Sequence, residues 1–131
     1  ISTVELSSFK VLILSQDFPL LEIENVYFDP GSAEIRQEDL IGLSVIANWL
    51  RQVPETELWV EGHADERGSA KGNLTLGWRR AEAVRAYLIH LGGDPTRIYA
   101  DSYGEERPAD PAHTEEAWAK NRWVEFRLII H

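Results

Sequence analysis

The sequence contains no cysteine and no methionine. The absence of cysteine excludes disulfide bonds, thiolate metal sites and cysteine nucleophiles. It does not identify the compartment, because a domain of this size can fold without disulfides even where they are permitted. The absence of methionine, including the initiator, predicts a trimmed part of a longer precursor. Any signal sequence or lipid anchor would then have been lost with the missing part.

Positive charge and long apolar runs are also scarce. Thirteen Lys and Arg face 22 Asp and Glu, and the net charge of -9 argues against a nucleic-acid-binding protein. The longest apolar run, Val11–Leu14, falls far short of the roughly 20 residues that span a bilayer. The start of the chain lacks the basic and apolar regions of a signal peptide. A composition of 44% hydrophobic and 27% charged residues is typical of a globular protein of one domain.

The predicted organisation is an N-terminal extension over residues 1–20, followed by a domain over 21–131. In the extension, a strand over 9–14 is expected to pack on the domain. In the domain, turn residues, helical spacing and alternation predict the following order. The elements are strand 21–28, a helix through Leu40, Leu43, Ala47 and Leu50 that ends before Pro54, strand 57–63, a helix from Asn73 or Thr75 to Gly92, strand 96–103, helix 114–120 and strand 122–130.

This order predicts an α+β fold, β-α-β-α-β-(α)-β, with two main helices on one face of a mixed sheet and an extra N-terminal strand. Alternation places five apolar residues toward the helices: Leu58, Val60, Val124, Phe126 and Leu128. The opposite face would carry Trp59, Glu61, Tyr99, Trp123, Glu125 and Arg127. We interpret that face as half-solvated and partly covered by residues 1–20, in preference to a partner-binding surface.

Arg80 is the most informative residue for function. It shares a helix face with Val84 and Leu88, so its charge lies at the start of an otherwise apolar stripe. A buried charge is costly without a partner, and Arg80 is therefore predicted to need a carboxylate, from the chain or from a ligand. Asp65, in the loop before the helix, is expected to lie beside it. From the spacing alone, a structural salt bridge is the favoured interpretation.

A longer pattern changes that interpretation. Residues 61–84 read EGHADERGSAKGNLTLGWRRAEAV and resemble the signature of OmpA-like peptidoglycan-binding domains, with the lipoprotein members as the nearest match. Three further motifs occur in the family's order, at residues 26–29, 102–108 and 120–122. The resemblance covers roughly residues 24–130.

The resemblance implies a non-catalytic domain that binds the diaminopimelate-containing stem peptide of peptidoglycan. By motif position, Asp65 and Arg80 match the family's ligand-binding residues. A carboxylate can bind the ammonium of diaminopimelate, and a guanidinium can bind its carboxylate through two hydrogen bonds. Substituting either residue by alanine is predicted to abolish binding and leave the fold intact. The matching motifs add Phe28, Asp29, Asn73, Leu74 and Arg122 to the expected ligand site.

Several of these residues also suit a purely structural role. Core packing accounts for Phe28 equally well, an N-cap for Asn73 and a strand-end surface charge for Arg122. The family often has Tyr where this chain has Gly72, so one aromatic wall is either missing or supplied by Trp78. The family's late motif often reads Asn-Arg-Arg, and Trp123 stands in place of its second Arg.

Other chemistry has weaker support. His63, Asp65 and Glu66 form a poor metal cage, and we predict no metal or cofactor. Glu105-Glu106 and Glu115-Glu116 are not placed for glycan cleavage, so an enzyme is disfavoured. An interaction module that uses the aromatic sheet face remains the alternative function.

The resemblance also implies a location and partners. The expected location is the periplasm, attached to the outer membrane through a missing N-terminal anchor. Tol-system proteins such as TolB are expected as partners besides peptidoglycan. Lipoproteins, porin tails and flagellar stators all carry such domains, so the parent protein stays open.

Overall fold

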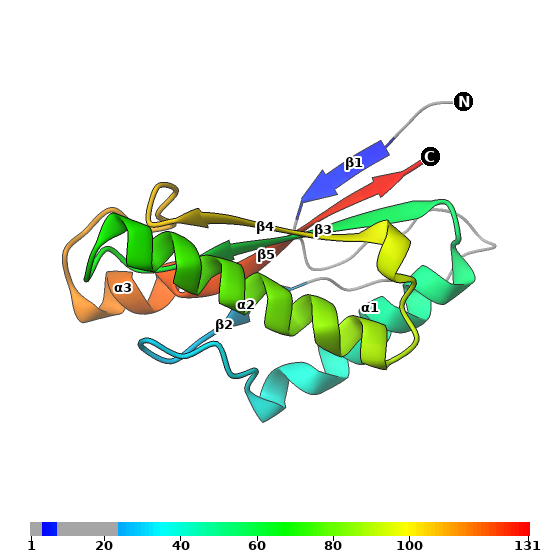
Figure 1. Cartoon of the computed structure of the whole chain (residues 1–131), viewed down its shortest axis with the longest axis horizontal. Helices are drawn as coiled ribbons and strands as arrows, with labels where there is room; N and C mark the ends of the chain where they lie inside the picture. The colour runs from blue at the N-terminus through cyan, green and yellow to red at the C-terminus, as the bar shows by residue number, and fades with distance from the viewer. Residues whose placement is uncertain (1–3, 8–23) are drawn as a thin grey trace.

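The computed structural model describes residues 4–7 and 24–131 (Figure 1). It confirms the predicted α+β fold. In chain order the elements are β1 (Val4–Ser7), β2 (Val26–Tyr27), the short 3-10 helix η1 (Gln37–Asp39), α1 (Leu40–Gln52), β3 (Thr56–His63), α2 (Ala70–His90), the 3-10 helix η2 (Pro95–Arg97), β4 (Ile98–Gly104), α3 (Glu115–Asn121) and β5 (Trp123–Ile130). In the described part of the chain, no helix has the length and apolar character of a membrane span.

The sheet has the strand order β1-β5-β3-β4, and β2 also pairs with β5. β3 and β4 are parallel because α2 returns the chain to the starting end of the sheet, whereas β5 is antiparallel to β3. α1 and α2 both lie on one face of this sheet (Figure 1). The carboxyl end of β3, the start of α2, α3 and the loop after β2 gather at one end of it.

The strand predicted over 21–28 is much shorter in the structure. Of the described residues 24–28, only Val26 and Tyr27 pair with β5, at Val124 and Trp123. β1 pairs with the other end of that edge, at residues 127–130. Residues 21–23 and the strand predicted over 9–14 lie outside the described residues.

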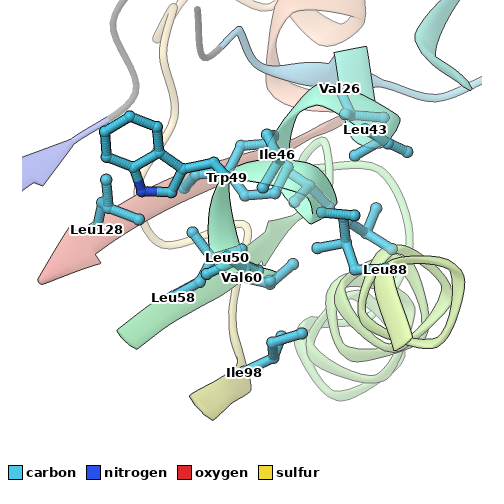
Figure 2. Close-up of a cluster of buried hydrophobic side chains, with 14 of the residues drawn as sticks. Val26, Leu43, Ile46, Trp49, Leu50, Leu58, Val60, Leu88, Ile98 and Leu128 are labelled. Carbon is cyan, nitrogen blue, oxygen red and sulfur yellow. The ribbon is translucent and has the colours of Figure 1, made fainter. Parts of the chain in front are cut away.

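The core lies between the helices and the sheet, as alternation predicted. Leu58, Val60, Val124, Phe126 and Leu128 are all buried on the helix side. Figure 2 shows side chains of α1, among them Leu43, Ile46, Trp49 and Leu50, packed toward the sheet residues Leu58, Val60 and Leu128. This core fixes the helices on the sheet and so determines where α2 begins.

Two glycines bring α2 and β3 into backbone contact. A Cβ atom built on Gly62 would lie 1.8 Å from the carbonyl oxygen of Gly77, and one on Gly77 would lie 2.4 Å from Ser102 Oγ. Neither position has room for a side chain. The close approach places Arg80, one turn beyond Gly77, against the end of β3.

The opposite face of the sheet carries the predicted aromatic and charged residues, several of which pair with each other. The Tyr103 hydroxyl donates to Glu61 Oε2 at 2.7 Å, and His63 Nε2 lies 2.9 Å from Glu125 Oε1. The His63 ring also stacks on Trp123 at 4.5 Å between centroids. These contacts join β3, β4 and β5 on this face, although His63 Nδ1 and Trp123 Nε1 are buried without a hydrogen-bond partner. The cover expected from residues 1–20 falls largely outside the described residues.

Candidate ligand-binding site

Arg80 lies at the centre of the site and is fully buried. Its Nε donates to Ser32 O at 2.8 Å and its Nη2 to Asp29 O at 3.1 Å, both in the loop after β2. Its Nη1 donates to His63 O at the end of β3, at 2.9 Å. The guanidinium carbon also lies 5.3 Å from the centre of the Phe28 ring. Arg80 therefore fastens the loop after β2 to the end of β3.

These contacts correct the prediction that Arg80 needs a carboxylate. Its hydrogen-bonding partners are three backbone carbonyl groups, which converge where the loop crosses the end of β3. Burial lowers the pKa of Arg80 to about 10, although the nearby Asp65 carboxylate favours the charged form. The side chain therefore remains charged at neutral pH, and the carbonyl dipoles compensate for its burial.

Asp65 is buried beside Arg80 and forms its ion pairs with two other arginines. Arg67 contacts both carboxylate oxygens, with Nε at 3.1 Å from Oδ1 and Nη2 at 3.0 Å from Oδ2. The Arg67 backbone N–H also donates to Oδ1 at 3.0 Å, and Arg122 Nη1 lies 3.4 Å from Oδ2. Burial favours the neutral acid, but the hydrogen bonds from Arg67 outweigh it and lower the pKa of Asp65. Asp65 is therefore ionised at neutral pH.

The lowered pKa of Asp65 predicts a pH-dependent stability. The ionised carboxylate stabilises the folded chain fully above its ordinary pKa of 3.8, and this contribution is lost as the pH falls through the lowered value. Urea unfolding of the wild type and Asp65→Asn should show a lower free energy of unfolding for the variant at pH 7. The difference should shrink at pH 3. A difference that stays constant between these pH values contradicts the assignment.

Arg122 connects the site to α3 and the last strand. Its side chain is 6% exposed, its Nε donates to Phe28 O at 3.0 Å, and its Nη2 lies 3.2 Å from Glu115 Oε1. The Phe28 N–H donates in turn to Arg122 O at 2.9 Å. Arg122 is thus part of the site and not a strand-end surface charge.

An open pocket of about 380 Å³ lies over Asp65. We call it the Asp65 pocket. It is lined by Pro30, Gly31, Asp65, Arg67, Gly68, Asn73 and Leu76. Arg80 bonds the carbonyl groups of Asp29 and Ser32, on either side of Pro30 and Gly31, and so holds this wall of the pocket.

The structure brings most of the predicted site residues together. Two of them, Asp65 and Asn73, line the Asp65 pocket. The others contact the residues that form its wall, on the side away from the opening: Phe28, Asp29, Arg80 and Arg122. Leu74 is placed elsewhere, in a separate pocket that it shares with Trp78. Trp78 therefore does not supply an aromatic wall to the Asp65 pocket. The Trp118 ring lies beside Arg67, with its centre 4.4 Å from the guanidinium carbon.

Asn73 does not act as the predicted N-cap. α2 begins one turn earlier, where Ser69 Oγ accepts a hydrogen bond from the Gly72 N–H at 3.0 Å. Asn73 is a buried residue of the first turn of α2, and its Nδ2 donates to Glu105 Oε1 at 3.1 Å. This contact ties α2 to the loop after β4.

Arg67 and Glu115 belong to the site but were not predicted from the sequence. Arg67 lies two residues after Asp65, a spacing at which a backbone N–H commonly donates to an Asp side chain. That local signal could have identified it. Glu115 contacts Arg122 and lies 3.7 Å from Arg67, but nothing local in the sequence indicates either contact.

Together the fold and the site define a small α+β binding domain, in which buried arginines fix an open pocket at the carboxyl end of a strand. The chain belongs to the OmpA family, whose model matches residues 27–122. This finding confirms the predicted resemblance.

Individual relatives support the same assignment. The chain is 41% identical over 108 residues to the peptidoglycan-associated lipoprotein of Brucella melitensis, covering 82% of this chain and 64% of that protein. The crystal structure of the peptidoglycan-associated lipoprotein from Burkholderia pseudomallei superposes with a TM-score of 0.78 at 36% identity, covering 79% of this chain and 88% of that one. The C-terminal domain of Helicobacter pylori MotB superposes with a TM-score of 0.74 at 28% identity, covering 81% of this chain and 84% of that one. The chain thus spans just under two thirds of the Brucella protein.

Proposed function

We propose that this chain is a non-catalytic domain that binds peptidoglycan through the diaminopimelate-containing stem peptide. The observation that carries the proposal is the Asp65 pocket, in which an ionised carboxylate lies beside the exposed guanidinium of Arg67. The relatives named peptidoglycan-associated lipoprotein support the choice of ligand.

The chemistry of the pocket suits a group with both charges. Diaminopimelate carries an ammonium and a carboxylate on one carbon atom. In our proposal the ammonium binds Asp65 and displaces Arg67, whose side chain is 42% exposed and lies over the Trp118 ring. The released guanidinium can then bind the ligand carboxylate.

Arg80 has a different part in this proposal. Three of its five N–H groups are used by backbone carbonyl groups, and the side chain is fully buried. It therefore positions the wall formed by Pro30 and Gly31. A ligand carboxylate reaches the remaining two N–H groups only if the loop at Asp29–Ser32 moves.

Asp65→Asn tests the proposal with little change in shape. We expect it to weaken binding of a diaminopimelate stem peptide at least tenfold, because it removes the charge that pairs with the ligand ammonium. Calorimetry with the peptide and pull-down with purified peptidoglycan measure this loss. Asp39→Asn, which removes one carboxylate near the start of α1, is the control and should bind normally. Undiminished binding by Asp65→Asn would contradict the assignment of Asp65 as the group that binds the ligand ammonium.

The cellular setting follows from the same proposal. The names of the relatives favour a lipoprotein parent, held at the outer membrane and reaching the wall in the periplasm. Tol-system proteins are the proposed partners. The sequence upstream of Ile1 distinguishes this parent from a porin tail or a flagellar stator.

A further inference from the structure

Two more pockets follow the Asp65 pocket around the first half of α2. The middle one has a volume of about 420 Å³ and is lined by Ser69, Lys71, Gly72, Thr75, Leu76 and Arg79. The far one has about 320 Å³ and is lined by Leu74, Thr75, Trp78, Asp101 and Ser102; we call it the Trp78 pocket. Leu76 lines both the Asp65 pocket and the middle pocket, and Thr75 lines both the middle pocket and the Trp78 pocket. The three therefore form one continuous surface.

The Trp78 pocket combines an exposed aromatic ring with a fixed carboxylate. Trp78 is 45% exposed and Leu74 is 47% exposed, although both are large apolar residues. Asp101 Oδ1 accepts from the Ser102 N–H at 2.8 Å, and Ser102 Oγ donates to Leu74 O at 2.7 Å. The first bond holds the Asp101 carboxylate in place and leaves its Oδ2 as an acceptor, and the second joins β4 to α2.

This combination suits a saccharide. A sugar ring presents C–H groups on its faces, which pack on an indole, and hydroxyl groups at its edge, which donate to a carboxylate. An apolar ligand would cover Asp101 Oδ2 without offering it a hydrogen-bond donor, at a cost in free energy. A saccharide uses both parts of the pocket.

We propose that the Trp78 pocket binds a sugar ring of the glycan strand that carries the stem peptide. The inference rests on the proposed function, because the peptide in the Asp65 pocket brings its glycan with it. L-Ala, γ-linked D-Glu and a lactyl group separate diaminopimelate from the sugar. An α-linked residue spans about 3.5 Å and the γ-link is longer, so the linker can extend over at least about 10 Å. That reach is of the order of the roughly 10–12 Å diameter of α2, around part of which the linker has to pass. Lys71 and Arg79 line the path and are exposed to meet the carboxylate of the second stem residue.

The test compares two ligands, the free tripeptide L-Ala-γ-D-Glu-diaminopimelate and the same tripeptide attached to its disaccharide. For the wild type, the disaccharide form should bind more tightly. Trp78→Ala should weaken binding of the disaccharide form about fivefold and leave binding of the free tripeptide unchanged. Tyr99→Ala, which removes an exposed aromatic from the other face of the sheet, is the control and should change neither. The indole N–H signal of Trp78 should shift in NMR spectra with the disaccharide form only.

The outcomes separate the two proposals. Equal affinity of the wild type for both ligands, or Trp78→Ala binding the disaccharide form like the wild type, overturns the saccharide site and leaves the peptide site standing. An equal loss for both ligands in Trp78→Ala also overturns it, because the residue would then act on the peptide. No binding of either ligand by the wild type overturns the proposed function and the saccharide site together.

Discussion

Replacing Arg80 with alanine should lower the free energy of unfolding by about 3–5 kcal/mol, the range typical of breaking a buried charged contact. The carbonyl groups of Asp29, Ser32 and His63 would each lose a charged donor in the interior. The missing side chain would also leave a cavity beside Phe28. These contacts replace the expectation from sequence that Arg80→Ala leaves the fold intact.

Urea denaturation followed by circular dichroism measures this effect, and the neighbouring arginine provides the control. Arg79 is exposed, so Arg79→Ala should change stability by no more than about 0.5 kcal/mol. Arg80→Lys keeps the charge, but an ammonium group cannot reach three carbonyl groups in three directions. Its free energy of unfolding should therefore lie between those of the other two variants. If the free energy of unfolding of Arg80→Ala lies within about 1 kcal/mol of the wild-type value, Arg80 does not fasten the loop to β3.

Gly62→Ala should destabilise the domain by about 3 kcal/mol or more. The added methyl group would meet the Gly77 carbonyl oxygen at 1.8 Å and its carbon at 2.7 Å. Both are backbone atoms in the second turn of α2, so no side-chain rotation relieves the overlap. α2 would have to move away from β3, and Arg80 would then lose its bond to His63 O.

Gly42→Ala is the matched control for this substitution. Gly42 lies within α1, and a Cβ atom there meets nothing within 4 Å. Alanine should therefore stabilise that helix by roughly 0.5–1 kcal/mol. Thermal or urea unfolding of the two variants should give shifts of opposite sign. A Gly62→Ala variant as stable as the wild type would show that β3 and α2 are not in backbone contact.

The order of the elements and the apolar face of the sheet could be predicted because both depend on local spacing. The start of α2 could not be. Ser69 and Asn73 are equally good capping residues. Asn73 lies inside the helix, where its side chain donates a hydrogen bond to Glu105, 32 residues away in the sequence.

The position of Arg80 in the site was predicted, but its partners were not. A carbonyl group is present at every residue, so no sequence pattern marks the ones that an arginine will reach. The same holds for Arg97, which donates to the carbonyl groups of Leu50, Val53 and Thr56. Asp65 was expected to form an ion pair with Arg80, because charged residues can be recognised in a sequence and the positions of backbone carbonyl groups cannot.

The pocket over Asp65 is lined by three stretches of chain, 30–31, 65–68 and 73–76, and hydrogen bonds from Arg80 and Arg122 link the first two of them. No stretch forms the site by itself, so a ligand has little affinity for the unfolded chain. Bound ligand therefore stabilises the whole domain by mass action, by about 2.7 kcal/mol at a free concentration about 100 times the Kd. In the proposed function, a wall ligand bound in this way would therefore also protect the domain against unfolding.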